Sequence, residues 1–132
     1  MHLVLPGDPY LVLRASRGQS IWNDSHLMRM KYEKILEEST LPIKIAGPIH
    51  ASITFYLVAP DLKKHGITYY RNSRQKQGYH QELPIMSELV RMIELLITGT
   101  IIDTRSSLAS LVAYKMYDEN PRVEIDLKKI KG

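Results

Sequence analysis

The sequence predicts an α+β fold in which two helices pack on a small mixed or antiparallel sheet of about four strands. Three observations predict it. Residues 49–57 alternate between apolar and polar side chains, which is the period of a half-buried strand. Residues 24–38 and 85–98 place apolar side chains at helical spacing. Two further strand-like segments, 108–117 and 122–128, follow, so the expected order is β-α-β-α-β-β.

The N-terminal elements are predicted from short apolar runs. Residues 3–5 and 10–13 are interpreted as short strand pieces separated by a proline-rich break, and residues 15–23 as a loop. Asp24 or Ser25 can cap the first helix, because a short polar side chain there accepts a hydrogen bond from the first helical turn.

Local signals also mark the elements of the second half. Residues 60–82 have no clear period, so they are predicted as one long loop. Pro84 opens the second helix, since a proline in the first turn gives up no hydrogen bond, and Gly99 follows its end. Residues 118–121 are a turn, which predicts that the last two strands form a hairpin.

Composition limits the classes of protein that the chain can belong to. With 132 residues it suits one domain, residues 1–132. It has no cysteine, which excludes disulfides, thiolate zinc sites and cysteine nucleophiles. The first ten residues are too broken by proline and glycine for a signal peptide or a membrane span. We therefore expect a cytoplasmic or other intracellular protein without membrane contact.

Basic residues gather in the segment 60–82. The chain has a net charge of +4, and this segment holds five basic residues against two acidic ones, with Tyr69, Tyr70 and Tyr79 among them. Lysine and arginine can contact DNA phosphates, and tyrosine can stack on unpaired bases at a branch point. A solvated loop with tyrosines packed on the sheet is the alternative. The same two interpretations, phosphate contact or solvent exposure, stay open for Arg14 and Arg17.

A set of residues at fixed spacing connects the second helix to the end of the chain. It comprises Pro84, Leu89, Gly99, Ser106, Lys115 and Tyr117. In this spacing the chain resembles the RusA-type Holliday-junction resolvases, in detail over residues 79–127 and elsewhere in the order of its elements. The resemblance implies a homodimer that binds four-way DNA junctions. In the family, Mg²⁺ held by aspartates cleaves the phosphodiester.

The resemblance also locates the positions of the catalytic site. The two aspartates of the helix start fall on Ile85 and Ser87, and a later acidic pair falls on Thr104 and Arg105. Mg²⁺ needs oxygen ligands, and an arginine in such a site repels the ion. We therefore expect no catalytic residue, no metal and no other cofactor at this site.

One alternative keeps the nuclease active. Asp103 and Glu88 lie one residue from the expected ligand positions, with Glu82 and His80 near in sequence. If they replace the lost ligands, Mg²⁺ is the cofactor and the chain is a crossover junction endodeoxyribonuclease. A third hypothesis is a structural or protein-interaction subunit that has kept the fold and lost DNA binding.

The preferred hypothesis is a RusA-like protein of DNA recombination and repair that binds branched DNA and is not an enzyme. Arg91 takes the position of a conserved lysine in the family pattern. The predicted DNA-binding residues are Arg14, Arg17, Lys63, Lys64, Arg71, Arg74, Lys76, Arg91 and Arg105. The helix 85–98 is apolar around most of its circumference, which predicts a homodimer that uses this helix as its interface.

Overall fold

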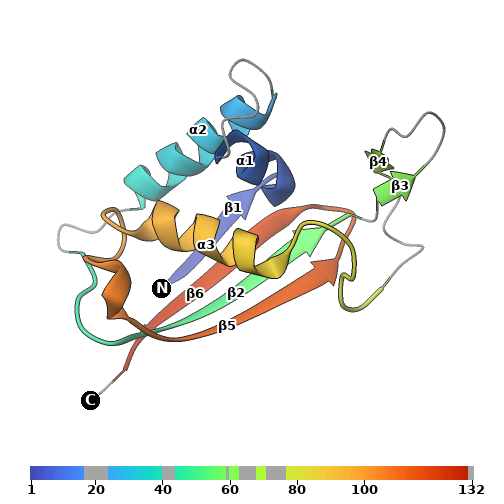
Figure 1. Cartoon of the computed structure of the whole chain (residues 1–132). Helices are drawn as coiled ribbons and strands as arrows, with labels where there is room; N and C mark the ends of the chain where they lie inside the picture. The colour runs from blue at the N-terminus through green and yellow to red at the C-terminus, as the bar shows by residue number, and fades with distance from the viewer. Residues whose placement is uncertain (17–23, 40–43, 59, 63–67, 71–76, 131–132) are drawn as a thin grey trace.

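The sheet and the helices form two layers. The computed structural model describes residues 1–16, 24–39, 44–58, 60–62, 68–70 and 77–130. Its four-stranded sheet has the order β1-β6-β2-β5, and three helices cover one face of that sheet (Figure 1). The bounds are β1 His2–Pro6, α1 Pro9–Ser16, α2 Asp24–Glu38, β2 Ile49–Leu57, α3 Met86–Ile97, β5 Leu108–Tyr117 and β6 Arg122–Lys129. The predicted α+β class and mixed sheet are confirmed, although the described residues form three helices rather than two.

β2 lies inside the sheet and forms much of the core. It pairs in parallel with β5 and antiparallel with β6 over most of its length. Every second side chain of β2 is buried: Ile49, Ala51, Ile53, Phe55 and Leu57. The strand predicted at residues 49–57 is therefore confirmed, and its alternation reflects one face under the helices and one face that is partly open.

The prediction of a strand at residues 10–13 is wrong, because this run belongs to α1. The Asp8 side chain accepts a hydrogen bond from the backbone N–H of Tyr10 at 2.9 Å, which caps the helix. Pro9 takes the first helical position, where its missing N–H costs no hydrogen bond. Val12 and Leu13 are both buried, and α1 packs against α2, so tertiary contacts stabilise a helix of only eight residues.

The predicted hairpin of the last two strands is also wrong. β5 and β6 lie on opposite sides of β2 and share no hydrogen bonds. The turn between them crosses the end of β2, where the N–H of Asp118 donates to the carbonyl of Leu57 at 3.0 Å. Two strand spacings amount to about 10 Å, a gap that a four-residue connection can bridge.

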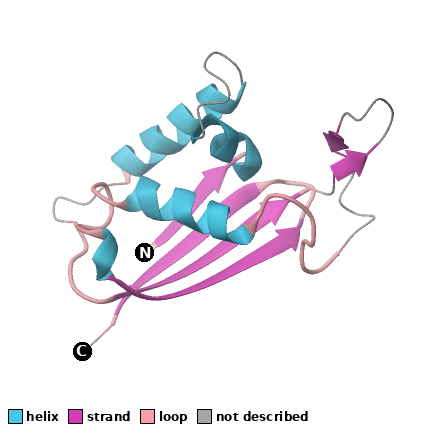
Figure 2. Ribbon diagram, viewed as in Figure 1, coloured by secondary structure: helices cyan, strands magenta, loops and turns pink. Residues whose placement is uncertain are grey.

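The segment predicted as one long loop contains two short strands. β3 (Pro60–Leu62) and β4 (Thr68–Tyr70) pair antiparallel and form a sheet separate from the four-stranded one (Figure 2). Strands of three residues are too short to produce a recognisable period, so the sequence gives no sign of them.

α3 begins at Met86 after the N-cap Ile85, so the prediction that Pro84 lies in its first turn is wrong, whereas its end agrees with the prediction. Gly99 follows its C-cap with a φ of +85°, a left-handed conformation that favours glycine. The buried residues of α3 are Leu89, Met92, Ile93, Leu96 and Ile97. No helix in the described ranges combines the length and the apolar character that a membrane-spanning helix needs.

Candidate functional site

Two side chains of β5 hold the segment that leads into α3. The ammonium group of Lys115 donates to the backbone carbonyl of Pro84 at 2.6 Å and also to that of Glu82. The hydroxyl of Tyr117 donates to the carboxylate of Glu82 at 2.8 Å and accepts from the backbone N–H of Gln81 at 3.3 Å. Burial lowers the pKa of Lys115, while the nearby Glu82 opposes that shift. The Lys-x-Tyr pair therefore fixes the start of α3 against the sheet.

His80 lies beside Tyr117 and is buried, with a relative exposure of 6%. Its Nδ1 lies 3.4 Å from the backbone N–H of Glu82, and its Nε2 lies 3.3 Å from the carbonyl of Val58. These contacts suit a neutral ring that accepts at Nδ1 and donates at Nε2. Its ring centroid lies 4.6 Å from that of Tyr117. Burial, and next to it the positive charge of Lys115, lower the pKa of His80.

The four family positions do not come together in one chain. Ile85 directly precedes α3 and is 52% exposed, and Ser87 is exposed in its first turn. Thr104 and Arg105 follow the other end of α3, at the short 3-10 turn before β5. A helix of twelve residues is about 18 Å long, so it separates the two pairs.

The displaced ligands of the alternative hypothesis are separated in the same way. Glu88 is in the first turn of α3, whereas the exposed Asp103 lies beyond the last turn, where its N–H donates to Ile45. No group of three or more histidine and acidic side chains within the described ranges is placed to hold a metal ion.

Arg105 has an acidic partner. Its Nε donates to the carboxylate of Glu94 on α3 at 2.7 Å, and the two side chains are 53% and 19% exposed. The positive charge at this family position is therefore neutralised within the chain. The hydroxyl of Thr104 hydrogen-bonds to those of Ser106 and Ser107, as expected for a turn rather than for a nucleophile.

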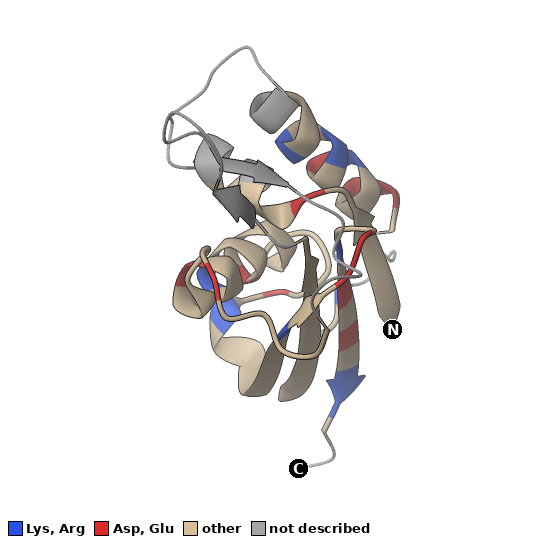
Figure 3. Cartoon of the chain, turned by 90° about the vertical axis from the view of Figure 1, so that its right-hand side faces the viewer, with Lys and Arg blue, Asp and Glu red and all other residues tan. Residues whose placement is uncertain are grey.

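Arg91 is in a different situation. It is exposed on α3, one helical turn after Ser87, and forms no ion pair with any residue that the structure describes. Arg14 lies in α1, and the other predicted basic residues lie outside the described residues: Arg17, Lys63, Lys64, Arg71, Arg74 and Lys76. Elsewhere both basic and acidic side chains occur along α2 and β6 (Figure 3).

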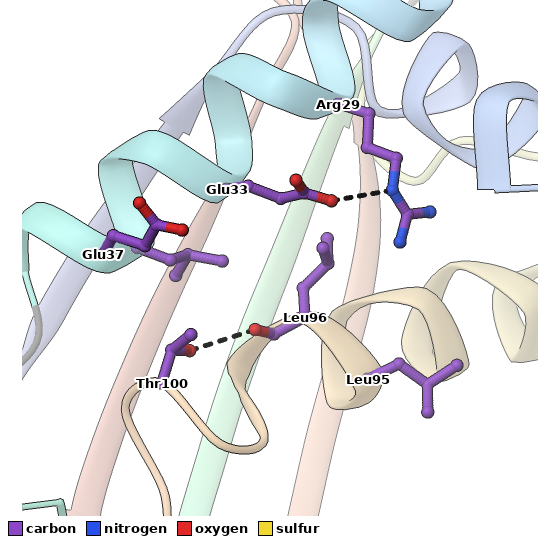
Figure 4. Close-up of a pocket in the computed structure, with 7 residues that line it drawn as sticks. Arg29, Glu33, Glu37, Leu95, Leu96 and Thr100 are labelled. Carbon is purple, nitrogen blue, oxygen red and sulfur yellow. Dashed lines mark hydrogen bonds and ion pairs between the residues drawn. The ribbon is translucent and has the colours of Figure 1, made fainter. Parts of the chain in front are cut away.

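A cleft of about 240 Å³ lies between α2 and α3 (Figure 4). It is lined by Arg29, Glu33, Leu36, Glu37, Leu95, Leu96 and Thr100. Arg29 donates to Glu33 at 2.9 Å, and the hydroxyl of Thr100 donates to the carbonyl of Leu96 at 3.0 Å. None of the residues that the sequence singled out lines this cleft.

The sequence pointed to Lys115 and Tyr117 only as part of a spacing, and it did not predict the roles of Glu82 and His80 in holding the start of α3. Lys115 and Tyr117 lie 31 to 35 residues after Pro84 and Glu82, to which they hydrogen-bond, so no local pattern shows these contacts. The signal that marks them is the Lys-x-Tyr motif itself.

Replacing Lys115 by methionine should lower the free energy of unfolding by about 2 kcal/mol, because two backbone carbonyls lose a charged donor. Denaturant unfolding measures the change. The matched control is Lys128→Met on β6, an exposed lysine whose loss should cost less than about 0.5 kcal/mol. Equal losses in the two variants would contradict the role of Lys115.

His80 should make the fold less stable in mild acid. Its pKa is lowered in the folded chain, so below about pH 6.5 the unfolded chain binds a proton that the folded chain does not. Stability is then fully present above this pH and falls as the pH decreases towards the folded-state pKa. His80→Gln should remove this part of the slope between pH 7.5 and 5.5 in thermal unfolding. His50→Gln, which leaves His80 in place, is the control and should keep the slope.

Comparison with models of known protein families finds no match to this chain, and none of the curated proteins matches it in sequence. The resemblance over residues 79–127 is therefore a basis for proposals only. The geometry adds three observations: β5 holds the start of α3, Arg91 forms no ion pair within the described ranges, and Arg105 is paired with Glu94.

Proposed function

We propose that this chain is a RusA-like protein of DNA recombination or repair that binds branched DNA, as a homodimer, without cutting it. The observation that carries the proposal is Arg91. It is exposed on α3, has no acidic partner among the described residues, and occupies the position where the resemblance implies a conserved basic residue. A guanidinium without an acidic partner binds a phosphate without first giving up an ion pair.

The surroundings of Arg91 support the proposal. Lys115 and Tyr117, two of the residues that carry the resemblance, hold the segment from which α3 begins. Because hydrogen bonds from β5 fix the start of the helix, the direction in which Ser87 and Arg91 face solvent is fixed as well. A positioned charge of this kind suits contact with the sugar-phosphate backbone, which sets the orientation of DNA on a protein.

The identity of the residues at the family positions supports binding rather than hydrolysis. None of Ile85, Ser87, Thr104 and Arg105 offers a carboxylate. Glu88 lies in the first turn of α3 and Asp103 lies beyond its last turn, so one chain does not join them into one set of ligands. Cleavage through Mg²⁺ would need several oxygen ligands around the same ion.

The remaining DNA-contact residues make unequal contributions in this proposal. Arg105 would have to exchange Glu94 for a phosphate, so its contribution is smaller than that of Arg91. Arg14, Arg17 and the basic residues of the segment 60–82 extend the contact on the basis of their charge and of the resemblance. Each phosphate contact adds about 0.9 to the steepness of the log–log salt dependence of binding.

The function is tested by gel-shift titration of the full chain with a synthetic four-way junction and with a linear duplex of the same sequence. The proposal expects tighter binding of the junction and no nicking in Mg²⁺ or Mn²⁺. Nicking that Asp103→Asn abolishes would show the active nuclease instead. Equal, weak binding of both DNAs, or none, would favour the subunit that has lost DNA.

Arg91→Gln should weaken junction binding about tenfold at 0.1 M salt and lower the salt slope by about one, because one charged phosphate contact is lost. Fluorescence anisotropy over a salt series measures both quantities. Lys34→Gln is the matched control, since it removes one positive charge from an exposed position on α2 and should change neither quantity by as much. If the two variants behave alike, only net charge matters and Arg91 has no specific role.

A further inference from the structure

β5 is an edge strand whose outer side is covered only in part. Within the described ranges its single full-length neighbour is β2. On the other side, the segment around Tyr79 pairs with the end of the strand: the N–H of His80 donates to Lys115 at 2.7 Å, and the N–H of Tyr117 donates to Gly78 at 3.0 Å. From Leu108 to Tyr114 no described strand pairs with the outer side.

The backbone geometry identifies the groups that point outward there. In a strand the N–H and C=O groups of alternate residues point to the same side. Because Lys115 and Tyr117 use theirs on the outer side, those of Ala113 and Leu111 point outward too. This alternation of backbone direction continues towards the start of β5 as far as Ser110, where the register with β2 shifts. Within the part of the chain that the structure describes, the outward-pointing backbone groups of Leu111 and Ala113 therefore pair with no other strand.

Edge strands are usually protected by charged side chains, prolines or bulges that prevent pairing. The stretch from Leu108 to Tyr114 reads Leu-Ala-Ser-Leu-Val-Ala-Tyr and contains neither a charge nor a proline. Its one irregularity is the register shift at its beginning. The edge therefore lacks the residues that normally prevent another strand from adding to the sheet.

Apolar side chains flank this edge on both faces of the sheet. Ten large hydrophobic residues are exposed in the described part of the chain, and five of them lie on β5 or on the segment 77–85 that leads into α3: Tyr79, Leu83, Ile85, Val112 and Tyr114. On the helix side, Leu111 and Ala113 are only half-buried, as are Met86 and Val90 of α3. Met86, Val90 and Glu94 are spaced four residues apart, so they lie on one face of α3. Because Glu94 contacts Arg105 just before β5, this face of the helix lies towards β5.

We propose that β5 pairs antiparallel with β5 of a second copy of this chain, about a twofold axis that passes Val112. In this register Leu111 of each copy lies opposite Ala113 of the other, and each such pair exchanges both of its backbone hydrogen bonds. Ser110 lies opposite Tyr114. Large side chains thus meet small ones, and no charged side chain from 108 to 114 meets a like charge across the axis.

The absence of charge along the edge is the argument for a second copy rather than another peptide. Twofold pairing of a strand with itself brings the residues near the axis close to their own copies, where a charged side chain would meet a like charge, and residues 108–114 contain none. The proposal deepens the homodimer in the proposed function and rests on that part of it alone. The sequence predicts a dimer contact along α3, but Ser87 and Arg91 make the solvent-exposed side of this helix polar. The proposal therefore places the contact at the edge of β5 and at the adjacent residues Met86 and Val90 of α3.

The experiment is cross-linking in the absence of DNA. Val112→Cys should form a disulfide-linked dimer under mild oxidation, because facing residues in a non-hydrogen-bonded antiparallel pair have Cα atoms about 4.5 Å apart. The chain has no native cysteine, so the new thiol is the single reactive one. Val4→Cys is the matched control: it is a valine on the opposite edge strand, β1, with a similar exposure of 43% against 38%, and should stay monomeric on non-reducing gels.

The register is tested by mixing two variants. Ser110→Cys and Tyr114→Cys should each cross-link poorly alone, and their mixture should give a mixed dimer. Val112→Lys should shift the unmodified dimer to a monomer in sedimentation analysis, with at least a tenfold rise in the dimer dissociation constant, since two lysines would then face each other. A wild-type chain that stays monomeric up to high micromolar concentration, or Val4→Cys linking as well as Val112→Cys, would overturn the proposal. Dimers that bind no DNA would leave it standing and overturn the proposed function instead.

Discussion

The position of β2 inside the sheet is the constraint on which the other features depend. A strand that buries every second side chain and bonds on both edges needs a neighbour on each side, and here those neighbours are β5 and β6. β5 runs parallel to β2, so the chain must return along the sheet before it, and α3 makes that return over the buried face. The start of α3 consequently lies near the end of β5, where Lys115 and Tyr117 can reach the segment before the helix.

The elements with a long and regular pattern could be predicted from the sequence. β2 and α2 are found at the predicted bounds, and α3 within a residue or two, because nine to fifteen residues of consistent period leave few alternatives. α1 could not be predicted, since a four-residue apolar run is equally compatible with a strand, and the capping Asp8 stands between two prolines in a stretch that is typical of a break. The order of the strands could not be predicted either, because β2 separates β5 from β6 by pairing with residues about sixty to eighty positions away in the chain.

For the site, the sequence could indicate positions but not partners. The spacing of Pro84 and the Lys-x-Tyr pair marks residues that the structure does bring together at the start of α3, whereas Gly99 follows the other end of the helix. What spacing cannot give is distance: the two pairs of family positions lie at opposite ends of α3, and Arg105 meets Glu94 eleven residues earlier in the chain. An ion pair of that kind depends on how α3 lies relative to the 3-10 turn, and thus on packing rather than on local pattern.

The uncharged edge of β5 has a consequence for the chain before it assembles. Seven consecutive residues with no charge and no proline, rich in leucine, valine and alanine, resemble the segments that stack into cross-β fibrils when their edges are free. A newly made chain would expose this segment until another strand covers it. The chain should then be prone to aggregate when it is synthesised faster than it assembles. A charged side chain placed on the edge of β5 should improve the solubility of the chain, although it would also prevent another strand from pairing there.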